Sequence, residues 1–139
     1  MSEEQKNQPK ASPKPRPGKV HGIAHLVAAA IYSIGGFKRL LQETSARHQF
    51  TAFVLVLALL FAVGANGLDY LIAYILFMVL LAVEALNTAI EEIVDAVSPD
   101  WSLMARNAKD LGSFAALAIM LAYGGFLVSV LYRFLNSTL

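Results

Sequence analysis

Four polar side chains follow one another along a stretch of sequence that is otherwise apolar. They are Glu84, Asn87, Glu91 and Asp95, and they come directly after the uncharged residues 70–83. On a helix, where each residue turns by about 100°, these positions fall within roughly 80° of one another. Carboxylates in apolar membrane segments are costly and rare, and they mark functional sites. The spacing therefore predicts a polar stripe, defined by these four residues, with a chemical role.

The residue types in and around the polar stripe fit the needs of phosphoryl transfer. Glu84 is placed to accept a proton from an alcohol, and Glu91 is placed to bind a hard cation such as Mg²⁺ through oxygen. Lys109 and Asp110 add a cation for phosphate charge and another carboxylate, and Glu43 is a further candidate ligand. Positioning and charge neutralisation dominate this reaction class. The sequence has no phosphate-cradling glycine loop, which excludes the kinases built on such loops.

Three other interpretations of the same residues stay open on the sequence alone. Glu92 and Asp95 fit a solvated helix end. Glu84 and Asn87 fit a hydrogen-bond cluster that joins helices within a membrane. Intramembrane carboxylates also line proton or ion paths, which would make the protein a small ion-coupled or proton-coupled membrane protein. To enclose a proton or ion path, a chain of this length would have to assemble into an oligomer.

Composition assigns the chain to the membrane proteins. Of 139 residues, 57% are hydrophobic and only 15% are charged, whereas soluble domains carry about 25% charged residues. The chain has no cysteine, which excludes disulfides, thiolate metal sites and cysteine nucleophiles. Its length fits one domain. The net charge is only +1, but eight of the eleven Lys and Arg residues precede residue 48.

Hydropathy predicts an all-α protein with one surface helix and three transmembrane helices. Residues 1–19 are basic and proline-rich and predict a disordered tail, whereas 20–139 form the integral-membrane domain. An amphipathic surface helix is expected over about 21–48, and spans over about 50–65, 69–97 and 110–134. A tight turn is expected at 64–67. Ser98 is expected to be the N-cap of a new helix, with Pro99 at its first position and Asp100 in its first turn.

Charge placement predicts the orientation and the partners. Lys and Arg concentrate before the first span and in the 98–110 loop, which predicts a cytoplasmic N-terminus and a periplasmic C-terminus, with Arg133 as the single exception. The polar stripe then crosses from lipid to cytoplasm. No binding motif accompanies the basic tail, so no nucleic-acid partner is expected.

Two segments resemble the prokaryotic diacylglycerol kinase family of small integral-membrane lipid kinases. They are EALNTAIEEIVDAVSP (84–99) and ARNAKDLGSFA (105–115). The surface-helix segment from Tyr32 through Gly36 and Lys38 to Glu43 also fits the family pattern. The similarity covers about residues 20 to 135.

The resemblance implies a homotrimer with active sites shared between subunits, located in the bacterial inner membrane. It implies transfer of the γ-phosphoryl group of ATP, with Mg²⁺, to a lipid alcohol. Glu84 matches the catalytic base, and Glu43 and Glu91 match the metal ligands. Residues that match or adjoin positions for the nucleotide and its metal are Tyr32, Glu43, Asn87, Glu91, Asp95, Asp100, Trp101, Ser102, Lys109 and Asp110. Candidate contacts to the lipid substrate are His25, Lys38, Arg47, Glu84 and Ser113.

Three positions depart from the family pattern and bear on the choice of substrate. His25 stands where the pattern has an Arg, Ile34 where it has a Trp, and Asn107 where it has a basic residue. The family includes both diacylglycerol kinases and undecaprenol kinases. The GSFA segment after Lys109-Asp110 is closer to the diacylglycerol branch, so diacylglycerol is the expected substrate and undecaprenol the alternative.

Overall fold

A computed structural model describes residues 22–138, so the tail expected over 1–19 lies outside the described residues. The chain divides into two units, residues 1–32 and 33–139, and each is described by itself. The described helices are α1 (Ile23–Leu40), α2 (Thr44–Ala62), α3 (Gly67–Val97) and α4 (Leu103–Thr138). No strand occurs among the residues described, which confirms the all-α prediction.

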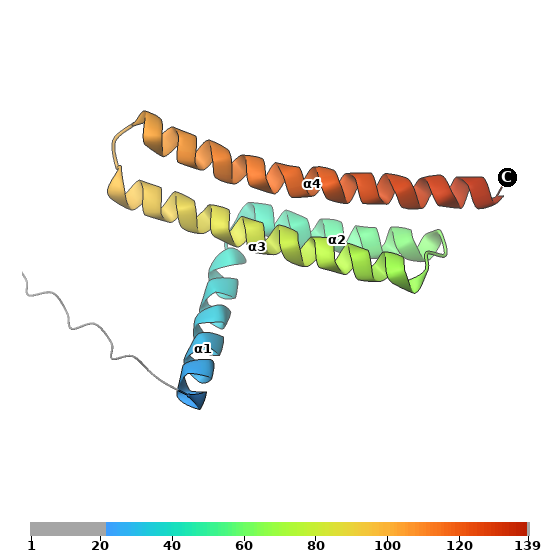
Figure 1. The fold of residues 1–139 in the computed structure, drawn as a ribbon, viewed down its shortest axis with the longest axis horizontal. Coiled ribbons are helices and arrows are strands. Elements are labelled where there is room, and N and C mark those ends of the chain that lie inside the picture. Colours follow the sequence, from blue (N-terminus) through green and yellow to red (C-terminus); the bar gives the residue numbers. More distant parts are fainter. Residues whose placement is uncertain (1–21, 139) are drawn as a thin grey trace, which may run out of the picture. The chain divides into compact units, whose positions relative to one another are not determined.

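Three of these helices are long and apolar enough to cross a membrane. Their candidate spans are Thr44–Ala62, Gly67–Val97 and Leu103–Ser137, with mean hydropathies of 1.5, 2.1 and 2.2. Within the second unit, α3 packs against both α2 and α4, and the three run side by side (Figure 1). The expectation of three spanning helices is therefore met by three apolar helices of sufficient length.

The surface helix ends earlier than expected, at Leu40 rather than near residue 48, and residues 44–48 form the first turns of α2. The break is a short turn closed by backbone hydrogen bonds of 3.1 Å from Gln42 to Arg39 and 3.0 Å from Glu43 to Leu40. Leu40 and Ala46 flank this turn and are both buried in the same core. On one straight helix, positions six apart point about 120° away from each other, so both can reach one core only if the helix is interrupted.

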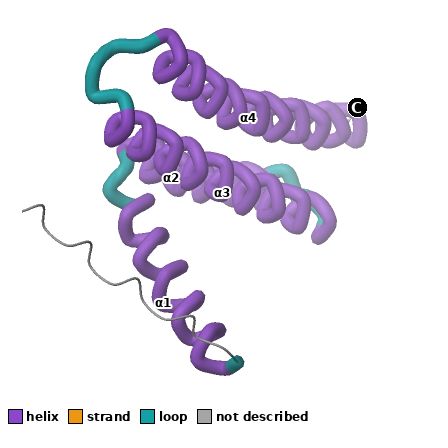
Figure 2. Tube along the Cα trace, turned by 60° about the vertical axis from the view of Figure 1, so that its left-hand side comes forward, coloured by secondary structure: helices purple, strands orange, loops and turns teal. Residues whose placement is uncertain are grey.

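The connection between α3 and α4 also differs from expectation. Ser98 ends α3, its backbone N–H donating to the Val94 carbonyl at 2.8 Å, and α4 begins at Leu103 rather than near 110. The capping hydroxyl is that of Ser102, which accepts a hydrogen bond from the Ala105 N–H at 3.1 Å. The prediction that Ser98 caps the new helix is therefore wrong, because Pro99 lies in the non-helical segment 98–102. Figure 2 shows this segment as the loop that joins α3 to α4.

Aromatic side chains fix α2 against α3. The rings of Phe53 and Phe77 stack with centroids 4.0 Å apart, and Phe50 meets Phe77 edge-on at 5.2 Å. Stacked and edge-on aromatic pairs contribute to the stability of a core beyond the apolar area that they bury. From α4, Tyr123 and Val130 complete the same core. This packing sets the register that brings the start of α2 to the polar stripe.

The turn between α2 and α3 is fixed by glycine and by a capping box. Gly64 has φ +63°, a backbone conformation that favours glycine. The side chain of Asn66 accepts hydrogen bonds from the backbone of Leu68 and Asp69, and the Asp69 carboxylate accepts one from the Asn66 N–H at 3.2 Å. The tight turn predicted at 64–67 is confirmed.

An ion pair joins α4 to this turn. Arg133 donates to the carboxylate of Asp69, whose side chain is only 5% exposed, whereas that of Arg133 is 53% exposed. Arg133, the one cation that ran against the expected orientation, is thus neutralised locally by an acidic neighbour.

We expect Arg133→Leu to lower the free energy of unfolding by about 1–3 kcal/mol, because the buried Asp69 carboxylate loses its counter-charge while the arginine head is half in solvent. Thermal unfolding in detergent micelles measures the effect. Adding Asp69→Asn to Arg133→Leu should recover part of the loss. The matched control is Arg106→Leu, which removes the exposed ion pair between Arg106 and Asp110, whose atoms are 3.5 Å apart. Equal losses in Arg133→Leu and the control would contradict the role given to this pair.

Candidate active site

The polar stripe lies on one uninterrupted helix, α3, as the spacing predicts. Its members are held by partners at successive levels. The amide of Asn87 donates to a carboxylate oxygen of Glu91 at 2.9 Å. One turn further, the ammonium group of Lys109 on α4 is 2.5 Å from a carboxylate oxygen of Asp95. The end of the stripe at Asp95 therefore faces α4.

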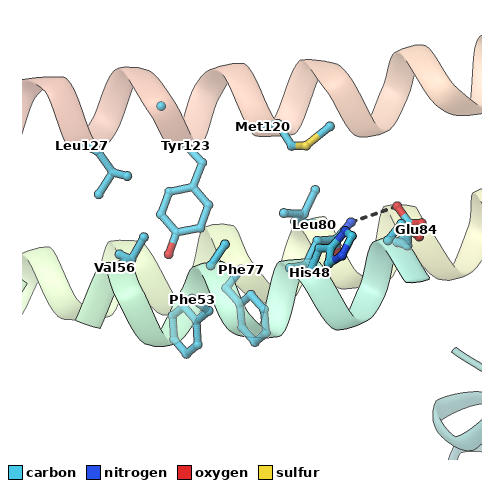
Figure 3. Close-up of a pocket in the computed structure, with 13 residues that line it drawn as sticks. His48, Phe53, Val56, Phe77, Leu80, Glu84, Met120, Tyr123 and Leu127 are labelled. Atoms are coloured by element: carbon cyan, nitrogen blue, oxygen red, sulfur yellow. Dashed lines mark hydrogen bonds between the residues drawn. The ribbon is translucent and has the colours of Figure 1, made fainter. Parts of the chain in front are cut away.

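Glu84 is the deepest acid of the stripe, with only 6% of its surface exposed. Two side chains from the first turns of α2 hold its carboxylate. The hydroxyl of Ser45 donates to one oxygen, and the amide nitrogen of Gln49 donates to the other at 2.9 Å. In Figure 3 a dashed line marks a hydrogen bond at Glu84. Burial without such donors would cost several kcal/mol.

A pocket of about 490 Å³ opens beside Glu84 between α2, α3 and α4. One end carries the polar groups of Ser45, His48, Gln49 and Glu84, and the rest, as far as Leu127, is apolar except for the hydroxyl of Tyr123 (Figure 3). Its volume is in the range of pockets that bind small ligands. A ligand with a hydroxyl group at one end and a hydrocarbon chain at the other would match this lining.

A second hollow of about 330 Å³ lies at the α3–α4 turn. It has a different character, because most of its lining is polar or charged. The lining includes six of the predicted nucleotide residues, and the whole set is Asp95, Ser98, Pro99, Asp100, Trp101, Ser102, Ala105, Arg106, Lys109 and Asp110. Six predicted residues of that set, Asp95, Asp100, Trp101, Ser102, Lys109 and Asp110, are thus brought together.

Glu43 precedes α2 and is held by a cation from α1. The guanidinium of Arg39 lies 2.5 Å from a Glu43 oxygen and 2.6 Å from a Glu92 oxygen. The hydrogen bonds to Glu43 and then to Glu92 raise the pKa of Arg39, so it stays charged. Glu92, which fits a solvated helix end on sequence alone, is exposed but is one side of a link between α1 and α3.

The carboxylates of the site suit a metal ion that is bound partly by the protein and partly by a substrate. Within residues 22–138, no group of three or more His, Asp or Glu side chains is close enough to hold a metal ion alone. Mg²⁺ commonly keeps several waters and takes one or two carboxylates together with substrate phosphates. Glu43 and Glu91 each have one oxygen engaged, by Arg39 and by Asn87. Their remaining oxygens fit that mode of binding.

The other predicted residues do not line either of the two pockets described above. Lys38 and Ser113 are exposed on α1 and α4, and Arg47 is exposed on α2 with its guanidinium 3.2 Å from the Thr44 hydroxyl. His25 and Tyr32 are exposed residues of the first unit, which is described by itself. Their roles toward the substrate and the nucleotide stay predictions.

Sequence reasoning missed four residues that contact the predicted ones. Ser45 and Gln49 are four apart at the start of α2, and this polar spacing on an apolar helix was the available signal. Arg39 could be suspected only as a basic residue near Glu43. Gly112 shows its role only in three dimensions, because Oδ1 of Asn87 occupies the place that a Cβ at residue 112 would take.

The chain is similar to proteins of one known family. The profile of the family described as prokaryotic diacylglycerol kinase matches residues 31–131. A protein named diacylglycerol kinase from Sinorhizobium sp is 53% identical over 106 residues, which cover 76% of this chain and 77% of the relative. A diacylglycerol kinase from Pseudomonas aeruginosa is 36% identical over 115 residues, covering 78% and 91%.

A third relative, a diacylglycerol kinase from Haemophilus influenzae, is 31% identical over 114 residues, which cover 78% of this chain and 97% of the relative. The matched region contains the polar stripe, the start of α2 that holds Glu84, and the α3–α4 turn. The chain therefore belongs to the prokaryotic diacylglycerol kinase family.

Proposed function

We propose that this protein transfers the γ-phosphoryl group of ATP to diacylglycerol and so forms phosphatidic acid. The observation that carries the proposal is the position of Glu84. Its buried carboxylate lies at the polar end of a pocket whose remaining lining is mostly apolar. That is the environment in which a lipid alcohol and a proton acceptor can meet away from bulk water.

In this reaction Glu84 takes the proton of the lipid hydroxyl while the hydroxyl oxygen forms its bond to the γ-phosphorus. The bond between the γ-phosphorus and its bridging oxygen breaks, and ADP leaves with the electron pair. General-base assistance of this kind is typically worth 10²–10⁴-fold in rate. The apolar lining of the pocket supports a substrate whose remaining bulk is hydrocarbon.

The hollow at the α3–α4 turn is proposed to receive the nucleotide. Lys109 and Arg106 offer positive charge for phosphate oxygens, and Trp101, exposed at the rim, offers a ring for stacking. Glu43 and Glu91 are the residues that would hold Mg²⁺, which when bound with ATP neutralises phosphate charge. The polar stripe would thus connect the lipid end of the site to the nucleotide end.

Location and assembly follow from the same proposal. The stripe has to open toward the compartment that holds ATP, which supports a cytoplasmic N-terminus and α3–α4 turn and a periplasmic C-terminus in the inner membrane. The excess of Lys and Arg before the first span agrees with this orientation. We further propose the homotrimer that the family resemblance implies.

The direct test is phosphorylation of diacylglycerol by the purified protein in mixed micelles with ATP and Mg²⁺. We expect Glu84→Gln to lower kcat by about 10²–10⁴-fold, because the amide cannot accept the proton. Glu91→Gln should also lower the rate. The matched control is Glu4→Gln, which lies outside the region that the family profile matches and should keep the full rate.

Each outcome separates the proposal from its rivals. Undecaprenol phosphorylated faster than diacylglycerol would assign the chain to the other lipid. No turnover with either lipid, or a full rate in Glu84→Gln, would exclude the kinase proposal. A proton flux that needs Glu84 but not Lys109 would favour an ion-coupled protein.

A second prediction concerns Gly112, which leaves room for Asn87. Gly112→Ala puts a methyl group where Oδ1 of Asn87 lies, so Asn87 must move and Glu91 loses its hydrogen bond. We expect the rate to fall about tenfold or more, while helix content is unchanged. The matched control is Gly125→Ala on the same helix, where a Cβ meets nothing within 4 Å.

The effect of Gly112→Ala should vanish in an Asn87→Ala background, because the substitution acts through Asn87. Undiminished loss in that background would show that Gly112 matters for helix packing alone.

A third prediction uses the ion pairs of Arg39 with Glu43 and Glu92 to test Glu43 as a metal ligand. Removing the charge in Arg39→Gln should tighten Mn²⁺ binding about threefold to fivefold, because a cation next to Glu43 opposes another. Glu92→Gln should weaken binding by a similar factor, since Arg39 then pairs with Glu43 alone. Electron paramagnetic resonance of free Mn²⁺, with a non-hydrolysable ATP analogue present, measures both. Shifts in the same direction, or none, would remove Glu43 from the metal site.

A further inference from the structure

The carboxylate of Glu84 is held by two neutral donors, and both come from α2. The Ser45 hydroxyl donates to Oε1, and the Gln49 amide donates to Oε2 at 2.9 Å. The two donors are four residues apart, so they occupy the same face of their helix. Each oxygen of the carboxylate thus has its own partner, which fixes the plane of the group as well as its position.

These hydrogen bonds replace a counter-ion. None of the ion pairs found in the described chain involves Glu84, although the residue is buried. A buried carboxylate needs compensation, and hydrogen bonds to a charged group are stronger than those between neutral groups. Two neutral donors meet that need without placing a cation against a group that must take up a proton.

The amide of Gln49 carries a cost that points to the same role. Its nitrogen must face Glu84, because two acceptor oxygens facing each other would repel. The carbonyl oxygen Oε1 is consequently turned away, and it is buried without a hydrogen-bond partner. An unsatisfied buried acceptor of this kind is uncommon and destabilises the fold. This loss of stability is consistent with a role for the Gln49 amide in donating to Glu84.

We propose that Ser45 and Gln49 are positioning residues that hold the Glu84 carboxylate toward the lipid hydroxyl. Both line the same pocket as Glu84. The proposal rests on the kinase function proposed above, in which Glu84 accepts the proton. Neither residue exchanges a proton or contacts the transferred phosphoryl group. Their effect is on the geometry of the base, where a shift of about 1 Å can cost up to 10²-fold in rate.

The experiment measures kcat and KM for ATP and for diacylglycerol in mixed micelles. We expect Ser45→Ala and Gln49→Met each to lower kcat roughly tenfold and to leave the KM for ATP within about twofold. Ser45→Thr, which keeps the hydroxyl, should restore most of the rate. The matched control is Thr51→Val, which removes a hydroxyl of α2 that bonds only to its own helix, at the Arg47 carbonyl. It should retain the wild-type rate.

A double-mutant cycle separates positioning from a general effect on the fold. In a Glu84→Gln background, Ser45→Ala and Gln49→Met should produce no further loss, because there is no carboxylate left to hold. The same tenfold loss in that background would overturn the proposal. The wild-type rate in both single variants would overturn it as well.

A spectroscopic measurement does not depend on turnover. The infrared carboxylate band of Glu84, obtained as the difference between wild type and Glu84→Gln, should shift in Gln49→Met and stay in place in Thr51→Val. An unshifted band would contradict the proposal. Absence of turnover in the wild type would exclude the kinase function, whereas wild-type turnover with unaffected variants would exclude only this inference.

Discussion

The hydrogen bonds from Ser45 and Gln49 to Glu84 join α2 to α3 at the level where an apolar helix becomes polar. A carboxylate buried there is tolerated only if a neighbouring helix supplies donors. That requirement explains why the first turns of α2 lie at this level of α3. It also explains the position of Glu43, which directly precedes α2 and therefore lies two residues from Ser45. One constraint thus brings the base and a candidate metal ligand to the same end of α2.

The same two helices continue as an apolar contact. Gln49 is followed one helical turn later by Phe53, which stacks on Phe77, two turns before Glu84 on α3. Because α2 and α3 are joined by a tight turn and run antiparallel, the contact changes along its length from hydrogen bonds to aromatic packing. A pocket that opens along this seam necessarily has one polar and one apolar end. The amphipathic character of the proposed site is therefore a property of how the helices pair.

The periodicity of the sequence predicts the helices and the stripe well, because apolar length and a 3.6-residue repeat are local signals. Helix ends were predicted less well. Whether 41–43 breaks a helix depends on burying Leu40 and Ala46 in one core, and this is a tertiary constraint. The partners of the stripe were missed for the same reason. Gln49 and Glu84 are 35 residues apart, and no local pattern pairs an amide with a particular carboxylate.

The kinds of partner along the site differ with depth. Glu84 and Glu91 are met by neutral hydroxyl and amide groups, whereas Asp95 and Glu43 are met by Lys109 and Arg39. Desolvation makes an ammonium or guanidinium group expensive at the deep end, and a cation there would stabilise the ionised carboxylate and oppose proton uptake. At the exposed end, these cations keep contact with solvent, so their desolvation penalty is small, and they can attract phosphate. The change of donor along the site therefore separates the group that accepts a proton from the groups that would meet a triphosphate.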